Sequence, residues 1–283
     1  MNSRIGLALL AIGLVVAARG ATGPVATLVV QPATPTAEGS VSPAPVLLEL
    51  TVFAAASLKD VLADVMTTYE AVRPDVTLAV SADSSATLRT QIEQGAPADV
   101  FLSADTTNPQ DLVDAGLTTG ALSPFAGNSL TVIVPSANPA GITGPIDLAK
   151  PGVKIIAAGD DVPITRYATE AVAKLATLEG YPADFAAAYA ANVVSREDNV
   201  GAVVAKIELG EGDAGIVYVT DANAADAVAR IAIPDAGNVS ATYAAVIVKT
   251  SLQVDAAQAF LDWLIGAEGQ AILARHGFLP PAQ

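Results

Sequence analysis

The stretch TVFAAASLKD, Thr51 to Asp60, is a buried-strand pattern that ends in three alanines and a serine where a helix begins. The helix that follows places apolar side chains on one face at the 3.6-residue period: Leu58, Val61, Leu62, Val65, Met66 and Tyr69. Ser57 opens an S-x-x-D sequence, which predicts a capping box at the start of this helix. Small residues at such a junction allow a ligand to approach the backbone closely.

The same alternation of strand and helix continues outward to the C-terminus. Apolar runs predict strands at 76–82, 98–104, 129–135, 154–159, 214–219, 230–234 and 243–248. Helical periodicity and turn residues predict helices at 86–94, 109–115, 164–178, 183–190, 199–209, 253–266 and 268–275. Strands separated by helices predict an α/β fold with parallel sheets covered on both faces, and ligands in such folds lie at the carboxyl ends of strands.

The N-terminal segment has the pattern of an export signal. Arg4 precedes an apolar run, Ile5 to Ala18, which is shorter than the roughly 20 residues that a membrane span needs. Small residues at Ala18-Arg19-Gly20 suit a cleavage site, so we predict a signal peptide at 1–20, with an uncleaved anchor as the alternative. Residues 21–47 are rich in Pro, Thr and Ser, which predicts an extended linker. The expected location is the periplasm or the outer face of the cell membrane.

Composition excludes several classes of function. The 283 residues contain no cysteine and one histidine, His276, which argues against disulfides, thiolate metal sites and Ser-His-Asp catalysis. A formal net charge of −15 argues against a nucleic-acid partner, which requires basic surfaces. No paired acid and base stand out, so the sequence predicts a protein that is not an enzyme and needs no cofactor.

Three more predicted helix N-termini follow strands. Ser84 and Ser85 precede ATLRTQI, Pro163 suits the first turn of the helix in DDVPITRYATEAV, and Asp198 or Asn199 can cap the helix in REDNVGAVVAKI. Each taken alone can be an ordinary helix cap. Helix N-termini carry unpaired N–H groups and about half a positive charge, so several together can bind an anion without lysine or arginine.

Four segments carry a resemblance to a known family: VFAAASLKDVL, SADSSATLRTQIEQGAPADVFLSAD, VPITRYATEAV and EDNVGAVVAKIELGEGDAGIVYVTDA. Over about 48–279 the chain resembles the periplasmic molybdate-binding proteins of ABC transporters. The resemblance implies a two-lobed type II periplasmic-binding fold, each lobe a mostly parallel sheet flanked by helices, with the ligand cleft between the lobes. It implies one lobe at 48–130 plus 237–283 and the other at 131–236, joined by two crossing strands.

The resemblance also implies the site. Hydroxyl donors fall on Ser57, Ser85 and Tyr218, and backbone N–H donors on Ile164 and Val200, with Ser84 and Asn199 as secondary candidates. The implied ligand is molybdate or tungstate, in which molybdenum is bound as an oxyanion with no direct protein ligands. The implied partner is the membrane permease of an ABC transporter, and the protein is expected to be a monomer.

Two charged residues leave alternatives open. Asp83 beside Ser84, if it points into the cleft, can accept a proton from hydrogen phosphate, so another tetrahedral oxyanion such as phosphate or sulfate is the alternative ligand. Arg166 can approach an anion from the first turn of its helix, and Thr165 stands where a small, flexible residue is expected. An anion-binding enzyme or sensor is the alternative class.

Overall fold

The computed structural model describes residues 47–281. The predicted signal peptide at 1–20 and all but the last residue of the predicted linker lie outside the described residues. None of the helices within 47–281 is both long enough and apolar enough to cross a membrane.

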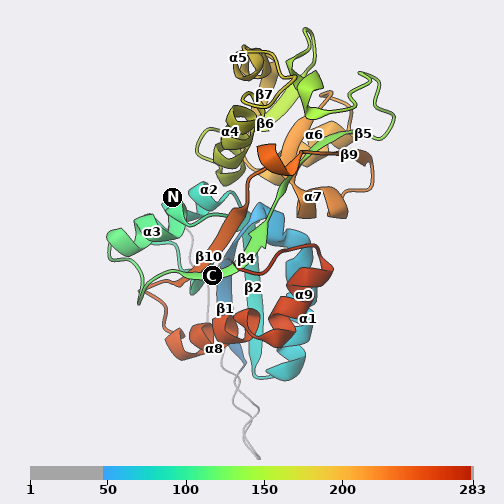
Figure 1. The fold of residues 1–283 in the computed structure, drawn as a ribbon. Helices are drawn as coiled ribbons and strands as arrows, with labels where there is room; N and C mark the ends of the chain where they lie inside the picture. Colours follow the sequence, from blue (N-terminus) through green and yellow to red (C-terminus); the bar gives the residue numbers. More distant parts are fainter. Residues whose placement is uncertain (1–46, 282–283) are drawn as a thin grey trace, which may run out of the picture. The chain divides into compact units, whose positions relative to one another are not determined.

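A five-stranded mixed sheet, here the first sheet, lies in the lower part of Figure 1, and its strand order is β2-β1-β3-β10-β4. Strand β1 is parallel to β2 and β3, while β10 is antiparallel to β3 and β4. The strands are β1 Leu48–Ala55, β2 Val76–Asp83, β3 Val100–Ser103, β4 Ser123–Asn128 and β10 Ala241–Ile247.

Helices cover both faces of the first sheet, because successive strand residues point to opposite sides. On one face Phe53, Phe101 and Val246 pack against α2 and α3 through Leu88 and Leu112. The opposite face packs against α1, α8 and α9 in the larger core. These helices are α1 Lys59–Val72, α2 Ser85–Glu93, α3 Thr107–Asp114, α8 Val254–Ile265 and α9 Ala267–Arg275.

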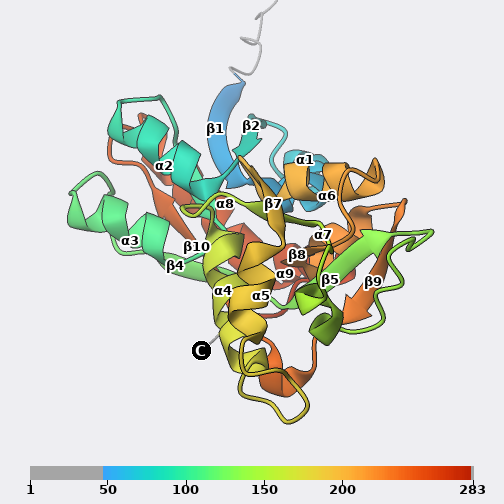
Figure 2. The ribbon, with the colours of Figure 1, turned by 90° about the horizontal axis from the view of Figure 1, so that it is seen from above.

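Two smaller sheets lie beyond the first sheet: β8-β5-β9, and the parallel pair β6-β7 (Figure 2). A parallel bridge between Ile155 and Ala214 joins β6 to the start of β8, so the combined order β7-β6-β8-β5-β9 repeats that of the first sheet. We call this combination the second sheet. Its strands are β5 Leu130–Pro135, β6 Ile155–Ala158, β7 Val193–Glu197, β8 Gly215–Tyr218 and β9 Val228–Ala232. Its helices are α4 Pro163–Leu175, α5 Phe185–Ala191, α6 Val200–Glu208 and α7 Val219–Ala224.

The predicted α/β class is confirmed, but β5 and β10 pair antiparallel with both of their neighbours. The chain passes from β4 to β5, and from β9 to β10, without an intervening α-helix (Figure 1). Only the short 3₁₀ helix η3, Asp235–Gly237, separates β9 from β10. These strands therefore enter their sheets from the opposite end to the parallel strands, which the alternation of strand and helix does not reveal.

Candidate functional site

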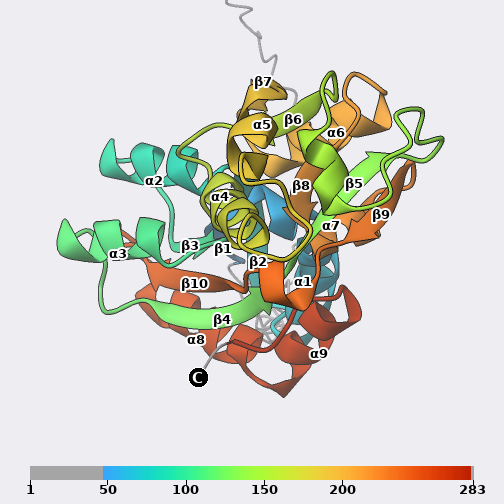
Figure 3. The same ribbon diagram turned by 45° about the horizontal axis from the view of Figure 1, so that its top comes forward.

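One small cavity, with about 210 Å³ of space between atoms, collects every residue that the sequence nominated for the site. Its lining comes from elements of both sheets, among them α2, α4 and α6, whose ribbons are labelled in Figure 3. Its lining consists of Ala55, Ala56, Ser57, Ser84, Ser85, Ala104, Val162, Pro163, Ile164, Asn199, Val200 and Tyr218. None of these lining residues has a charged side chain.

The first sheet brings its serines together through strand register. Ala55 at the end of β1 pairs with Asp83 at the end of β2, so the segments that follow them leave the sheet side by side. One segment is η1, Ala56–Leu58, which carries Ser57, and the other opens α2 with Ser84 and Ser85. The alanines at the strand end leave the space that the cavity occupies.

The second sheet contributes two helix N-termini and a tyrosine. Pro163 and Ile164 open α4 after β6, and Val200 opens α6 after β7. The side chain of Asn199 accepts a hydrogen bond of 3.0 Å from the Ala202 N–H, which confirms Asn199 as the N-cap of α6. The N–H groups of Ile164 and Val200 lie in first turns, where no helical carbonyl precedes them as an acceptor. Both backbones are therefore free to donate to a ligand.

Two buried hydroxyls at the cavity have no hydrogen-bond partner: Ser84 Oγ and Tyr218 OH. Ser84 is 3 % and Tyr218 is 1 % exposed. Leaving a buried hydroxyl unsatisfied costs about 1–3 kcal/mol, so an orphaned pair that faces one cavity indicates a ligand with acceptor atoms. Ser85 Oγ accepts a hydrogen bond of 3.1 Å from the Ala104 N–H, which leaves its own proton to donate.

Burial keeps the tyrosine at the cavity protonated. It raises the pKa of Tyr218 well above 10, so the phenol is a hydrogen-bond donor at neutral pH. Asp221 accepts a hydrogen bond of 3.2 Å from the Tyr218 N–H, and desolvation raises the pKa of its carboxyl to about 7. Asp221 does not line the cavity, so the groups that face a ligand remain uncharged.

The capping box predicted at Ser57 is wrong. The α1 helix has Leu58 as its N-cap, with no side-chain cap hydrogen bond, because a 3₁₀ turn precedes it and places Ser57 inside helical backbone. The hydroxyl of Ser57 instead lies 2.8 Å from the hydroxyl of Tyr243. Ser57 is thereby available to the cavity rather than to its own helix.

Asp83 does not point into the cavity. Its Oδ1 accepts hydrogen bonds from the Ser84 N–H at 2.7 Å and from Asn199 Nδ2 at 2.9 Å. The second contact joins β2 of the first sheet to the start of α6 on the second. Asp83 is therefore engaged beside the site and is absent from the lining.

Arg166 does not line the cavity either. Its guanidinium contacts Asp105 Oδ2 at 3.3 Å, hydrogen-bonds Thr107 Oγ1 and lies 5.1 Å from the ring centre of Tyr167. Its neighbour Thr165 donates its hydroxyl to Ala158 O and its N–H to Val162 O, so Thr165 is used inside its own loop. Arg166 thus joins α4 to the start of α3, across the two sheets.

We expect Arg166→Ala to weaken ligand binding by up to about fivefold, chiefly through faster dissociation, because it removes a partly exposed ion pair that joins the two sheets. Stopped-flow release of the ligand measures this. Arg196→Ala is the matched control, since its ion pair of 2.9 Å with Asp160 stays within the second sheet. Equal release rates in the two variants would show that the Arg166 contact does not hold the site closed.

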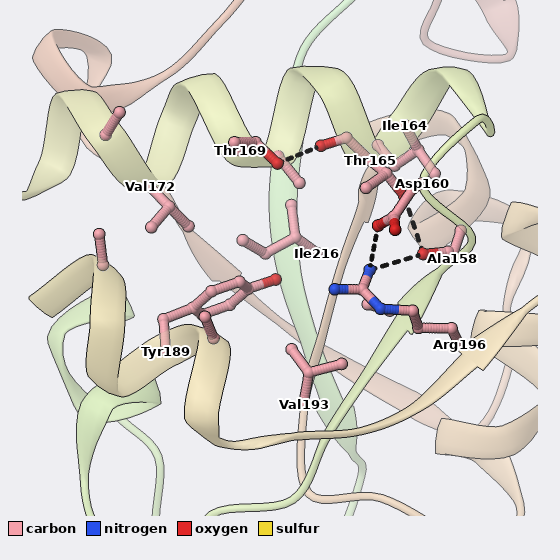
Figure 4. A pocket seen from close by; sticks show the side chains of 15 residues that line it. Ala158, Asp160, Ile164, Thr165, Thr169, Val172, Tyr189, Val193, Arg196 and Ile216 are labelled. Atoms are coloured by element: carbon pink, nitrogen blue, oxygen red, sulfur yellow. Dashed lines mark hydrogen bonds and ion pairs between the residues drawn. The ribbon is translucent and has the colours of Figure 1, made fainter.

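A second pocket, with about 750 Å³ of space between atoms, lies between α4 and α5 (Figure 4). Its walls are mostly apolar, and the Tyr189 hydroxyl points into it, with burial raising the pKa of this phenol to about 12. The cation in its lining, Arg196, is occupied by Asp160 at 2.9 Å and by Ala158 O at 3.4 Å. The cation of this pocket is therefore already paired with acceptors of the protein.

Sequence reasoning missed two residues behind the cavity, Tyr243 and Asn128. Tyr243 OH contacts Ser57 Oγ, and Asn128 Nδ2 lies 3.3 Å from Tyr243 OH. Tyr243 falls in a strand run that predicts only core packing, and the segment of Asn128 was not predicted as a strand. No local signal identifies either of them.

One family model and two known proteins match most of this chain. The family model described as "Bacterial extracellular solute-binding protein" matches residues 50–279. The chain is 34 % identical over 233 residues to the molybdate-binding protein ModA of Mycobacterium tuberculosis, which covers 82 % of this chain and 85 % of that protein. It is 32 % identical over 238 residues to ModA of Escherichia coli, covering 81 % of this chain and 88 % of that protein.

The solved structure of the Azotobacter vinelandii periplasmic molybdate-binding protein has the same fold. It superimposes with a TM-score of 0.69 at 24 % identity, covering 82 % of this chain and 100 % of that chain. The predicted type II periplasmic-binding fold is confirmed.

Proposed function

Because this chain belongs to the family of bacterial extracellular solute-binding proteins, we propose that it captures molybdate or tungstate outside the cytoplasm and delivers it to an ABC-transporter permease. We further propose that the two sheets with their helices are the lobes at 48–130 plus 237–283 and at 131–236, which close around the ligand. The curated ModA relatives, at up to 34 % identity over most of the chain, support this ligand class.

The observation that carries the proposal is the chemistry of the cavity lining. It offers hydroxyls from Ser57, Ser84, Ser85 and Tyr218, with backbone N–H groups, and no charged side chain. Molybdate and tungstate are dianions at neutral pH that only accept hydrogen bonds. A site built from donors matches such a ligand on every side, and two first-turn N–H groups add the field of their helix N-termini.

The same chemistry disfavours hydrogen phosphate. Hydrogen phosphate carries a proton and therefore needs a hydrogen-bond acceptor in the site. The carboxylate of Asp83 could be that acceptor, but it already accepts hydrogen bonds from Ser84 and Asn199. Sulfate is fully deprotonated like molybdate, so discrimination between them depends on the size of the closed cavity. Sulfate is therefore the alternative ligand that the test must include.

Hydrogen bonds from uncharged donors can bind a dianion in this site without lysine or arginine. A hydrogen bond to a charged group contributes about 1.5–3 kcal/mol, so several of them can offset the desolvation of a dianion. The net charge of −15 opposes encounter only weakly, because salt screens charges beyond about 8 Å at physiological ionic strength. Local donors therefore decide affinity.

A binding role fits the lining better than a catalytic one. An enzyme that acts on an anion needs a general acid or base within reach, and the lining contains no His, Asp, Glu or Lys. The histidine of the chain, His276, instead contacts Asp64 at 2.9 Å and is absent from the cavity. We propose that the ligand is bound and released unchanged, and that no cofactor takes part.

Titration calorimetry with molybdate, tungstate, sulfate and phosphate tests the proposal. We expect one site per chain, similar affinities for molybdate and tungstate, and weaker binding of the other two anions. Sulfate or phosphate binding at least as tightly as molybdate would overturn the ligand assignment. Binding of none of the four would overturn the oxyanion site itself.

A further inference from the structure

A hydrogen-bond network lies behind the cavity, and two of its residues, Tyr243 and Asn128, are not part of the cavity lining. Tyr243 on β10 is fully buried, and its hydroxyl lies 2.8 Å from Ser57 Oγ and 3.3 Å from Asn128 Nδ2. Asn128, also fully buried, ends β4 and is 115 residues away from Tyr243 in sequence. Neither residue lines the cavity, and the Tyr243 hydroxyl is connected to it by a hydrogen bond through Ser57.

The amide of Asn128 determines which group donates and which accepts in this network. Its Oδ1 accepts a hydrogen bond of 3.0 Å from the Ser129 N–H, which orients the amide, and its Nδ2 also donates to Thr220 Oγ1 at 2.8 Å. An amide nitrogen can only donate, so the Tyr243 oxygen accepts from it. The phenol proton is then directed to Ser57 Oγ, which leaves the Ser57 proton free to point into the cavity that Ser57 lines.

We propose that Tyr243 and Asn128 are positioning residues that orient the Ser57 hydroxyl as a donor toward the bound oxyanion. This inference rests on the proposed function of the cavity. A hydroxyl that is already oriented loses less freedom when the ligand binds, which increases affinity without a new ligand contact. It also makes the site more selective for anions that carry no proton.

Surrounding groups support this arrangement. The Tyr243 ring is held edge-on by Phe125, Tyr218 and Phe278, at centroid distances of 6.1, 5.6 and 5.5 Å. Burial raises the pKa of Tyr243 well above 10, so its proton stays in place at neutral pH. Rigid packing and a retained proton are what a positioning group requires.

A double-mutant cycle between Tyr243→Phe and Ser57→Ala, read by molybdate calorimetry on the full chain, tests the proposal. We expect Tyr243→Phe alone to weaken binding by up to about tenfold, because the Ser57 hydroxyl remains but loses its fixed orientation toward the anion. In the Ser57→Ala background the same change should have almost no further effect. Tyr69→Phe is the control, because it removes another buried tyrosine hydroxyl, one without a hydrogen-bond partner, from the core near α8.

If Tyr243→Phe fails to fold, Asn128→Asp provides a second test of the positioning role. A carboxylate at that position accepts the phenol proton, so the Ser57 proton turns to the phenol oxygen and away from the cavity. We expect a loss of molybdate affinity larger than that of Tyr243→Phe, and a smaller loss when Ser57 is already alanine.

The outcomes separate this inference from the function on which it rests. If the unmodified protein fails to bind molybdate, the proposed function is wrong. If it binds, and the effects of Tyr243→Phe and Asn128→Asp are unchanged by Ser57→Ala, the positioning role is wrong while the function stands. Coupling of either variant to Ser57, with Tyr69→Phe inert, supports the positioning role.

Discussion

Removing three hydroxyls at once, as in the Ser57→Ala, Ser85→Ala, Tyr218→Phe triple variant, is expected to lower molybdate affinity by about a thousandfold or more. Each of these groups can donate one hydrogen bond to the anion, and each such bond contributes about 1.5 kcal/mol at the least. The single variants should each lose about tenfold or more. Calorimetry measures the affinities, and unchanged affinity in all three single variants would refute the site assignment.

Tyr218→Phe separates loss of binding from loss of folding. The Tyr218 hydroxyl is buried without a partner, so its removal relieves an unsatisfied group and should leave the melting temperature unchanged or raised. Affinity and stability should therefore change in opposite directions. Tyr189→Phe is the matched control, because it removes the same group from the second pocket (Figure 4) and should leave molybdate binding intact.

The second large effect is expected for Val200→Pro, which removes a backbone donor without touching a polar side chain. Val200 is the first residue of α6, a position where proline is favoured. The preceding residue Asn199 has φ −156° and ψ 170°, the extended backbone that a residue before proline prefers. We expect affinity to fall by about 10- to 100-fold with the helix intact, since a charge-assisted hydrogen bond is lost.

Val200→Ala is the control for that experiment. It trims the buried side chain, which is 4 % exposed, but keeps the N–H, so molybdate affinity should stay close to that of the unmodified protein. Circular-dichroism melts of both variants report any loss of packing. If the proline variant binds as tightly as the alanine variant, the Val200 N–H is not a ligand donor.

The sequence predicted the elements of the site better than the pairing of the strands. Helix and strand boundaries depend on local periodicity and turn residues, so α1, α4 and α6 begin within two residues of the expected positions. The strands β4 and β7 were not predicted, because SPFAGN contains Pro and Gly and VVSRE is short and polar. The antiparallel entry of β5 and β10 is set by where the chain crosses between sheets.

A junction between a strand and a helix is built from neighbouring residues, so the sequence is enough to predict that strand ends with small residues lead into helix N-termini and which donors they expose. Only the tertiary structure decided that junctions from two sheets share one cavity, that Asp83 and Arg166 are occupied beside it, and that Tyr243 and Asn128 stand behind Ser57. Those contacts join residues up to 186 positions apart. Their geometry follows from sheet register and core packing, for which a single sequence contains no local pattern.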